Sequence, residues 1–130
     1  MNGLHQNDSF FINKLTEIVN RNLQDENFSP NDLANAAGMS RSSIHRKLKA
    51  STGLDASRFI RKIRLERSFE MLKNSSDTVS EIAFKVGFGS PAYFTKCFHE
   101  YYGYPPVEVR RRLSDDISSV NNHKNQIEEA

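Results

Sequence analysis

Four polar side chains lie at positions that place them on one face of a predicted helix. They follow the spacing i, i+3, i+4, i+7 and are Ser42, His45, Arg46 and Lys49. Ile44 and Leu48, four residues apart, point the other way and predict a buried side. An arginine can donate two hydrogen bonds to O6 and N7 of guanine, so we expect Arg46 to read a base. His45 either contacts a base or is simply solvated.

A second helix, about fifty residues further on, shows the same division into two faces. Phe94 and Phe98 face inward, and the outward positions are Ala92, Thr95, Lys96 and His99. Ala92 and Thr95 can pack against a thymine methyl group. The aromatic spacing is that of a buried face, so a core role is favoured over base stacking for Phe94, Phe98, Tyr101 and Tyr102.

Phosphate contacts are expected from basic side chains near the ends of these helices and from the segment between them. The expected contacts to the DNA backbone are Arg41, Lys49, Arg61 and His99. Arg64 and Arg67 are instead expected to form structural ion pairs with acidic neighbours. No residue is expected to be catalytic, and we expect neither a cofactor nor a metal.

The charge of the chain is concentrated in one stretch, although the net charge is only +2. Residues 41–73 carry 10 basic and 3 acidic side chains, whereas residues 1–40 carry 2 and 5. Such a basic stretch indicates a surface that binds a polyanion. The alternative, weighted about equally on charge alone, is a solvated helix surface.

An internal repeat with an offset near 50 residues organises the sequence. In each copy a hydroxyl residue precedes a carboxylate by three positions, Ser29 before Asp32 and Thr78 before Glu81, which is typical of a helix N-terminus. Matching glycines and serines then predict a turn and a second, capped helix; they are Gly38, Ser40, Gly87 and Ser90. Each copy therefore predicts a helix-turn-helix unit.

The remaining periodicity completes an all-α fold without strands. We expect a disordered segment over residues 1–8, a first helix-turn-helix unit over 9–54 whose first helix begins near Ser9, and a linker helix over 55–73 capped by Asp55. A second unit over 74–113 ends in a short helix after Pro106, and residues 114–130 are expected to be a disordered tail. The linker, at about 18 residues and 1.5 Å per residue, would be roughly 27 Å long, comparable with one turn of DNA.

Other classes of protein find little support. No apolar stretch is long enough to span a bilayer, and there is no secretory signal, so membrane contact by this segment is not expected. The single cysteine, Cys97, excludes an internal disulfide and is expected to be a packing or surface thiol in a cytoplasmic protein. The four histidines are too scattered to suggest a zinc site.

These residues resemble the DNA-binding domain of the AraC/XylS family of bacterial transcription regulators. The resemblance spans about residues 9–112 and is carried by Met39-Ser40-Arg41, Arg46-Lys47-Leu48-Lys49, Phe59-Ile60-Arg61, Ile82-Ala83, Val86-Gly87-Phe88 and Tyr93-Phe94. The stretch from Ser40 to Lys49 looks most like the output domains of hybrid two-component regulators from Bacteroides-type bacteria. One departure is Pro105, which replaces a hydroxyl residue before the last helix and removes a candidate phosphate contact.

The length of the linker helix would let two recognition helices, near residues 40–51 and 90–101, enter successive major grooves, and the resemblance implies seven helices. It places base contacts on Ser42, His45, Arg46, Ala92, Thr95 and Lys96. It further implies activation of transcription through contact with RNA polymerase, and a sensory or dimerisation domain elsewhere in the parent protein. The alternatives are a DNA-repair module, which would need zinc-binding cysteines beyond Cys97, and a helical protein-interaction domain.

Overall fold

The computed structural model describes residues 2–116, and all regular elements within this range are helices. Six of them are α1 (Asn2–Arg21), α2 (Pro30–Ala37), α3 (Arg41–Thr52), α4 (Ala56–Asn74), α5 (Val79–Lys85) and α6 (Pro91–Tyr102). A seventh, the C-terminal helix, covers residues 107–116. The prediction of an all-α fold with seven helices is confirmed.

The two ends of the chain differ from the prediction. Helix α1 begins at Asn2, so the expected start near Ser9 and the expected disorder of residues 2–8 are wrong. No proline interrupts the residues before Ser9, and the helix continues back through them. At the other end, residues 114–116 continue the C-terminal helix, and the rest of the predicted tail, 117–130, lies outside the described residues.

The predicted caps begin five of the helices, α2 to α6, and at the start of α5 Thr78 accepts from the Glu81 N–H over 3.1 Å. Ser29 forms a complete capping box with Asp32: the Asp32 N–H donates to Ser29 Oγ over 3.2 Å, and the Ser29 N–H donates to Asp32 Oδ2 over 2.9 Å. Ser40 and Ser90 each accept a hydrogen bond from the backbone N–H three residues on, at 3.1 and 3.2 Å. Asp55 accepts from the Arg58 N–H over 2.8 Å. These bonds satisfy backbone donors that the first turn of a helix leaves unpaired.

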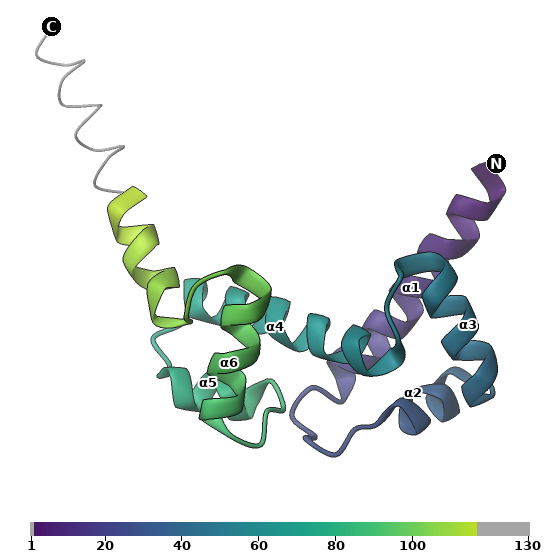
Figure 1. Cartoon of the computed structure of the whole chain (residues 1–130), viewed down its shortest axis with the longest axis horizontal. Helices are drawn as coiled ribbons and strands as arrows, with labels where there is room; N and C mark the ends of the chain where they lie inside the picture. The colour runs from purple at the N-terminus through teal and green to yellow at the C-terminus, as the bar shows by residue number, and fades with distance from the viewer. Residues whose placement is uncertain (1, 117–130) are drawn as a thin grey trace, which may run out of the picture.

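Side chains form two separate cores, and α4 contributes to both. The first core joins α1, α2, α3 and the N-terminal half of α4, through residues that include Leu15, Leu33 and Ile44. The second joins the C-terminal half of α4 to α5, α6 and the C-terminal helix, through residues that include Ile82 and Phe94. The molecule therefore consists of two helix-turn-helix units on one shared rod (Figure 1).

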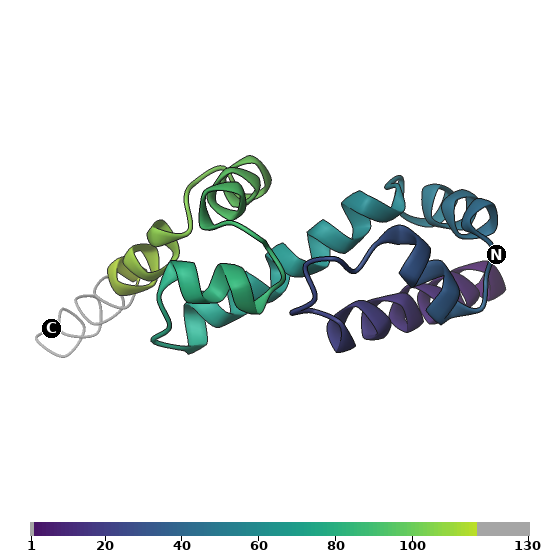
Figure 2. The same ribbon diagram turned by 90° about the horizontal axis from the view of Figure 1, so that it is seen from below.

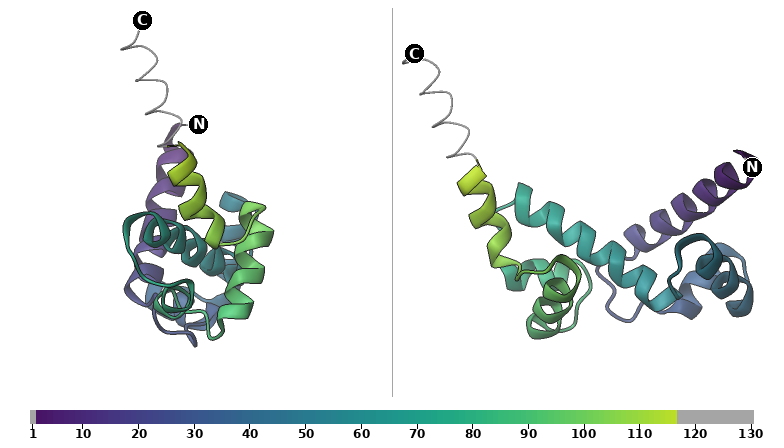
Figure 3. Two further views of the ribbon diagram at one scale, coloured as in Figure 1. Left: turned by 90° about the vertical axis from the view of Figure 1, so that its left-hand side faces the viewer. Right: turned by 45° about the horizontal axis from the view of Figure 1, so that its top comes forward.

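Helices α3 and α6 run in similar directions near opposite ends of α4. Seen from below, α6 lies beside the C-terminal half of α4, α3 lies just beyond its N-terminal end, and both are viewed nearly end-on, so they run roughly parallel (Figure 2). Helix α1 and the C-terminal helix project away from opposite ends of α4 (Figures 1 and 3). Within residues 2–116 no helix is both long and apolar enough to cross a bilayer.

Candidate nucleic-acid interface

Helix α3 presents the predicted polar face to solvent. Its four predicted members, Ser42, His45, Arg46 and Lys49, are all exposed. On the opposite face Ile44 and Leu48 are 1% and 0% exposed and pack in the first core. The orientation of this helix, predicted from periodicity alone, is therefore confirmed, and the N-terminal half of its exposed face is free to meet a base edge.

Two of the basic residues around α3 have partners within the chain. The Arg41 Nη1 donates to Asn31 Oδ1 on α2 over 2.8 Å, and the Lys49 Nζ donates to the Gly53 carbonyl over 3.2 Å. Both side chains are exposed, so either can exchange its partner for a phosphate at little cost. These contacts hold the two cations near the two ends of α3, where phosphate contacts are expected.

The loop between α3 and α4 places a carboxylate next to the basic face of α3. Asp55 caps α4, and the hydrogen bond from the Arg58 N–H lowers the pKa of its carboxyl, against a smaller opposing effect of burial. The charges of Arg58, Lys49 and His45 lower that pKa further. The carboxylate therefore stays ionised at neutral pH and stabilises the start of α4.

Helix α6 shows the same division into buried and outward faces. Ala92, Lys96 and His99 are exposed, and Thr95 is half-buried. Phe94 and Phe98 are fully buried, which confirms their predicted core roles, and Cys97, expected to be a packing or surface thiol, is 4% exposed. The outward face of α6 carries fewer charges than that of α3, which makes it the less basic of the two helices.

The two tyrosines at the end of α6 behave differently from one another. Tyr102 is half-buried and packs against Phe98, with ring centroids 4.5 Å apart. Tyr101 is 45% exposed, and its hydroxyl donates to Glu66 Oε1 on α4 over 3.2 Å. The expectation of a core position for Tyr101 is thus wrong, because its ring lies over the surface of α4, where the hydroxyl finds an acceptor.

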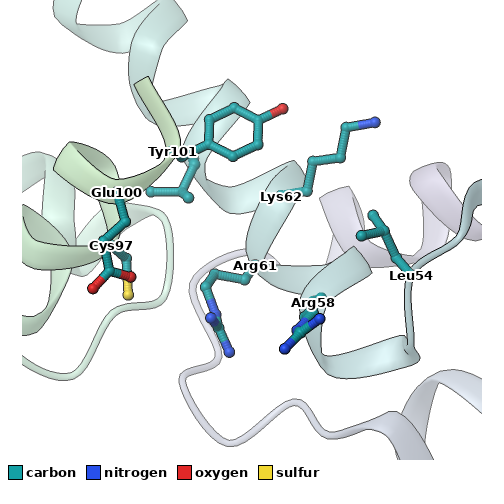
Figure 4. A pocket seen from close by; sticks show the side chains of 8 residues that line it. Leu54, Arg58, Arg61, Lys62, Cys97, Glu100 and Tyr101 are labelled. Carbon is teal, nitrogen blue, oxygen red and sulfur yellow. The ribbon is translucent and has the colours of Figure 1, made fainter. Parts of the chain in front are cut away.

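Basic side chains of α4 line a cleft between the two units. The cleft has a volume of about 220 Å³, and its lining residues are Leu54, Arg58, Arg61, Lys62, Leu65, Cys97, Glu100 and Tyr101. The guanidinium groups of Arg58 and Arg61 point in the same direction (Figure 4). Arg61 is half-buried here, as suits a contact close to the rod. Sequence reasoning missed Arg58 and Lys62, although their i, i+3, i+4 spacing with Arg61 was a usable signal.

Arg64 and Arg67 do not form the ion pairs that were expected. Arg64 is 5% exposed and donates to three backbone carbonyls, with no carboxylate among its hydrogen-bond partners. Arg67 is exposed and forms no ion pair among the described residues. Among the side chains that the structure describes, residues 8–116, no three of His, Cys, Asp or Glu are close enough to bind a metal ion.

Tandem helix-turn-helix units with two exposed recognition helices define a class, the helix-turn-helix DNA-binding domains. A family model described as a helix-turn-helix domain matches residues 33–112. The sequence is 33% identical over 110 residues, 85% of this chain, to histidine kinase P4 of Formosa agariphila, of which it spans 8%. It is 34% identical over 79 residues, 61% of this chain, to the HTH-type transcriptional activator RhaS of Escherichia fergusonii, of which it spans 28%.

Solved structures share the fold. An AraC-type transcriptional regulator of Chromobacterium violaceum aligns with a TM-score of 0.74 at 24% identity, over 85% of this chain and 95% of that one. The DNA-binding domain of AdpA, crystallised with a target DNA, aligns with a TM-score of 0.72 at 24% identity, over 81% and 94% of the two chains. The chain belongs to the AraC-type helix-turn-helix family, the sequence-specific DNA-binding domains of transcription regulators.

Proposed function

We propose that the chain binds promoter DNA with α3 and α6 in two successive major grooves on one face of the duplex. The observation that carries this proposal is the common orientation of the two helices, which run roughly parallel near opposite ends of α4 (Figure 2). Helix α4 has 19 residues, which corresponds to about 28 Å at 1.5 Å per residue. Successive major grooves on one face of DNA are about 34–36 Å apart, so a rod of this length suits the task.

Within this arrangement, the base contacts are assigned to the outward residues nearest the start of each helix. They are Ser42, His45 and Arg46 on α3, and Ala92, Thr95 and Lys96 on α6. Arg46 offers two parallel donors to a guanine, while Ala92 offers a methyl group to a thymine. Because α3 is the more basic helix, we expect it to make the stronger contribution to affinity.

Contacts to the DNA backbone are assigned to Arg41, Lys49, Arg61 and His99. Arg41 and Lys49 lie near the two ends of α3, and His99 lies in the last turn of α6. Arg61 extends from α4 next to Arg58 (Figure 4). Such contacts hold the register of the protein on the duplex and carry no sequence information themselves.

The parent protein is proposed to be a longer regulator of which this chain is the output domain. The chain spans less than two thirds of the relatives it matches, and these include a protein named as a histidine kinase and one named as a transcriptional activator. This supports a cytoplasmic two-component regulator, of the Bacteroides hybrid type, with a separate sensory or dimerisation domain. The relative named as a transcriptional activator supports activation of transcription, for which RNA polymerase is the proposed protein partner.

A footprint on a selected binding site tests the mode of binding. Rounds of selection from random duplexes identify the site, and hydroxyl radicals then cleave the DNA wherever protein does not cover it. We expect two protected patches on one face of the duplex, with centres about 10–10.5 base pairs apart. A single protected patch would contradict the insertion of two helices, and a failure to enrich any sequence would contradict sequence-specific reading by this chain.

A further inference from the structure

A buried arginine ties the two helix-turn-helix units together. Arg64 lies on α4 between Ile63, which packs in the first core, and Leu65, which packs in the second. Its Nη1 donates to the carbonyls of Leu23 and Val86 over 2.9 and 2.8 Å. Its Nη2 donates to the Asp25 carbonyl over 2.8 Å. One guanidinium therefore joins segments that lie 41, 39 and 22 residues away along the chain.

The three acceptors belong to different units. Leu23 and Asp25 are in the segment that follows α1, whereas Val86 is the C-cap of α5. The loop after α1 and the loop after α5 lie side by side next to α4 (Figures 1 and 2). The side chain of Leu23, which follows α1 of the first unit, also packs in the second core. Arg64 and Leu23 therefore both contribute to the contact, or junction, between the two units.

The junction is electrostatically well matched. The carbonyl of Val86, the C-cap of α5, lies at a helix C-terminus, where carbonyl groups lack partners within the helix and carry partial negative charge. A guanidinium that donates to carbonyl groups forms charge-assisted hydrogen bonds, which are stronger than neutral ones. Burial lowers the pKa of Arg64, and the nearby charge of Asp25 opposes this effect. Because the group is buried with its carbonyl partners, replacing it leaves all three carbonyls without this donor.

A single helix would fix the relative orientation of the two units only weakly, because small bends and twists along α4 would rotate one unit against the other. A second attachment that joins both units to the same point of α4 restricts this rotation. We propose that Arg64 is a positioning residue that fixes the orientation of α3 relative to α6, and so sets the spacing between the two DNA half-elements that the chain accepts. This inference rests on the proposed insertion of both helices into successive grooves.

Spacing-variant duplexes test the inference. One added base pair between the half-elements moves the second groove by about 3.4 Å and rotates it by about 35°. We expect the parent chain to lose roughly 10- to 100-fold in affinity on this duplex, as for the loss of one or two base contacts. Arg64→Met should bind the original site more weakly but lose only about threefold on insertion or deletion of one base pair, because its units can reorient.

A matched control separates positioning from stability. Arg110 likewise donates to two carbonyls, from Nε to Leu72 over 3.0 Å and from Nη2 to Ser75 over 2.8 Å, but both carbonyls belong to the second unit. Arg110→Met should therefore destabilise the chain and keep the spacing profile of the parent. If circular dichroism shows that Arg64→Met is unfolded, Arg64→Lys replaces it, since one ammonium group keeps the charge but cannot reach all three carbonyls.

The outcomes distinguish the two levels of the proposal. If the parent chain itself tolerates every spacing, the insertion of both helices into successive grooves is wrong. If the parent is sensitive to spacing and the folded Arg64 variant is equally sensitive, Arg64 does not set the orientation and the inference is overturned. A broadened profile in the Arg64 variant, together with an unchanged one in Arg110→Met, supports it.

Discussion

The guanidinium of Arg64 occupies the space that a β-carbon on Gly87 would need. Gly87 follows α5 with φ at +85°, and a β-carbon built there would overlap Arg64 Nη1 and the Leu23 carbonyl oxygen. Two requirements therefore meet at this position: a left-handed backbone and a missing side chain. In the first unit the corresponding glycine, Gly38, has φ at +69° and an open surrounding. Both copies of the repeat therefore have a glycine in the left-handed conformation after the first helix. Only in the second copy do other groups, Arg64 and the Leu23 carbonyl, lie against that glycine.

Replacement of these two glycines by alanine should have unequal effects. Gly38→Ala is expected to lower the free energy of unfolding by about 1–2 kcal/mol, the cost of a left-handed backbone for an alanine. Gly87→Ala should lower it by about 1–3 kcal/mol more, because Arg64 and the Leu23 carbonyl must move as well. Urea-induced unfolding of both variants measures the difference. Equal losses would show that the junction yields easily to an added methyl group.

Phe98→Ala tests the assignment of the α6 aromatic residues to the core. The ring is fully buried and packs against Phe94, Tyr102 and Tyr104, with centroid distances of 5.7, 4.5 and 6.3 Å. Its removal should lower the free energy of unfolding by roughly 3–5 kcal/mol. Tyr101→Ala, on the same helix but 45% exposed, serves as the control and should cost about 1 kcal/mol or less. A Phe98 variant that melts like the parent and binds DNA weakly would instead indicate base stacking.

Most of the local architecture could be predicted because its causes are local. The capping box of Ser29 and Asp32 and the burial of Ile44 and Leu48 each depend on residues within a few positions of one another. The tie made by Arg64 depends on carbonyls as far as 41 residues away, and no side-chain pattern marks a backbone acceptor. An ion pair was therefore the natural expectation, and it was wrong. The position of Tyr101 was predicted wrongly for a related reason, since helical spacing cannot show that Glu66 on α4 offers an acceptor to its hydroxyl.

The cap of α4 should depend on pH. The Asp55 pKa is lowered in the folded state, chiefly by the hydrogen bond from the Arg58 N–H. Because the folded value lies below the unfolded one, the stabilisation by the ionised form is present above the unfolded pKa of about 3.9 and is lost as the pH falls through the folded value. At neutral pH, Asp55→Ala should lower the free energy of unfolding by about 1 kcal/mol.

The pH series needs a cap that does not titrate, and Asp55→Asn provides it. Urea-induced unfolding at pH 7, 5, 4 and 3 should show the gap between the parent and Asp55→Ala narrowing below about pH 4. The gap between Asp55→Asn and Asp55→Ala should stay constant over the same range, since asparagine caps helices about as well as aspartate. If the difference in the free energy of unfolding between the parent and Asp55→Ala stays constant down to pH 3, the negative charge of Asp55 adds no stability beyond that of an uncharged cap.

Base reading and phosphate binding on α3 should separate in two single variants. Arg46→Ala is expected to cost about 1–3 kcal/mol on the selected site and to relax the preference at one base pair. Lys49→Ala should weaken binding to selected and random duplexes alike, and should make the slope of log affinity against log salt shallower by about one. Titrations on selected, single-substituted and random duplexes, at several salt concentrations, provide both measurements.

The contrast between the two variants decides the assignment, because any loss of charge from a basic surface can weaken binding. Both side chains are exposed and lie off the buried face of Ile44 and Leu48, so both variants should melt close to the parent. Lys49→Ala also loses the hydrogen bond to the Gly53 carbonyl, but a surface contact of this kind contributes little to stability. If Arg46→Ala instead lowers affinity equally for all duplexes, this arginine binds the DNA backbone. Recognition by α3 would then depend on Ser42 and His45.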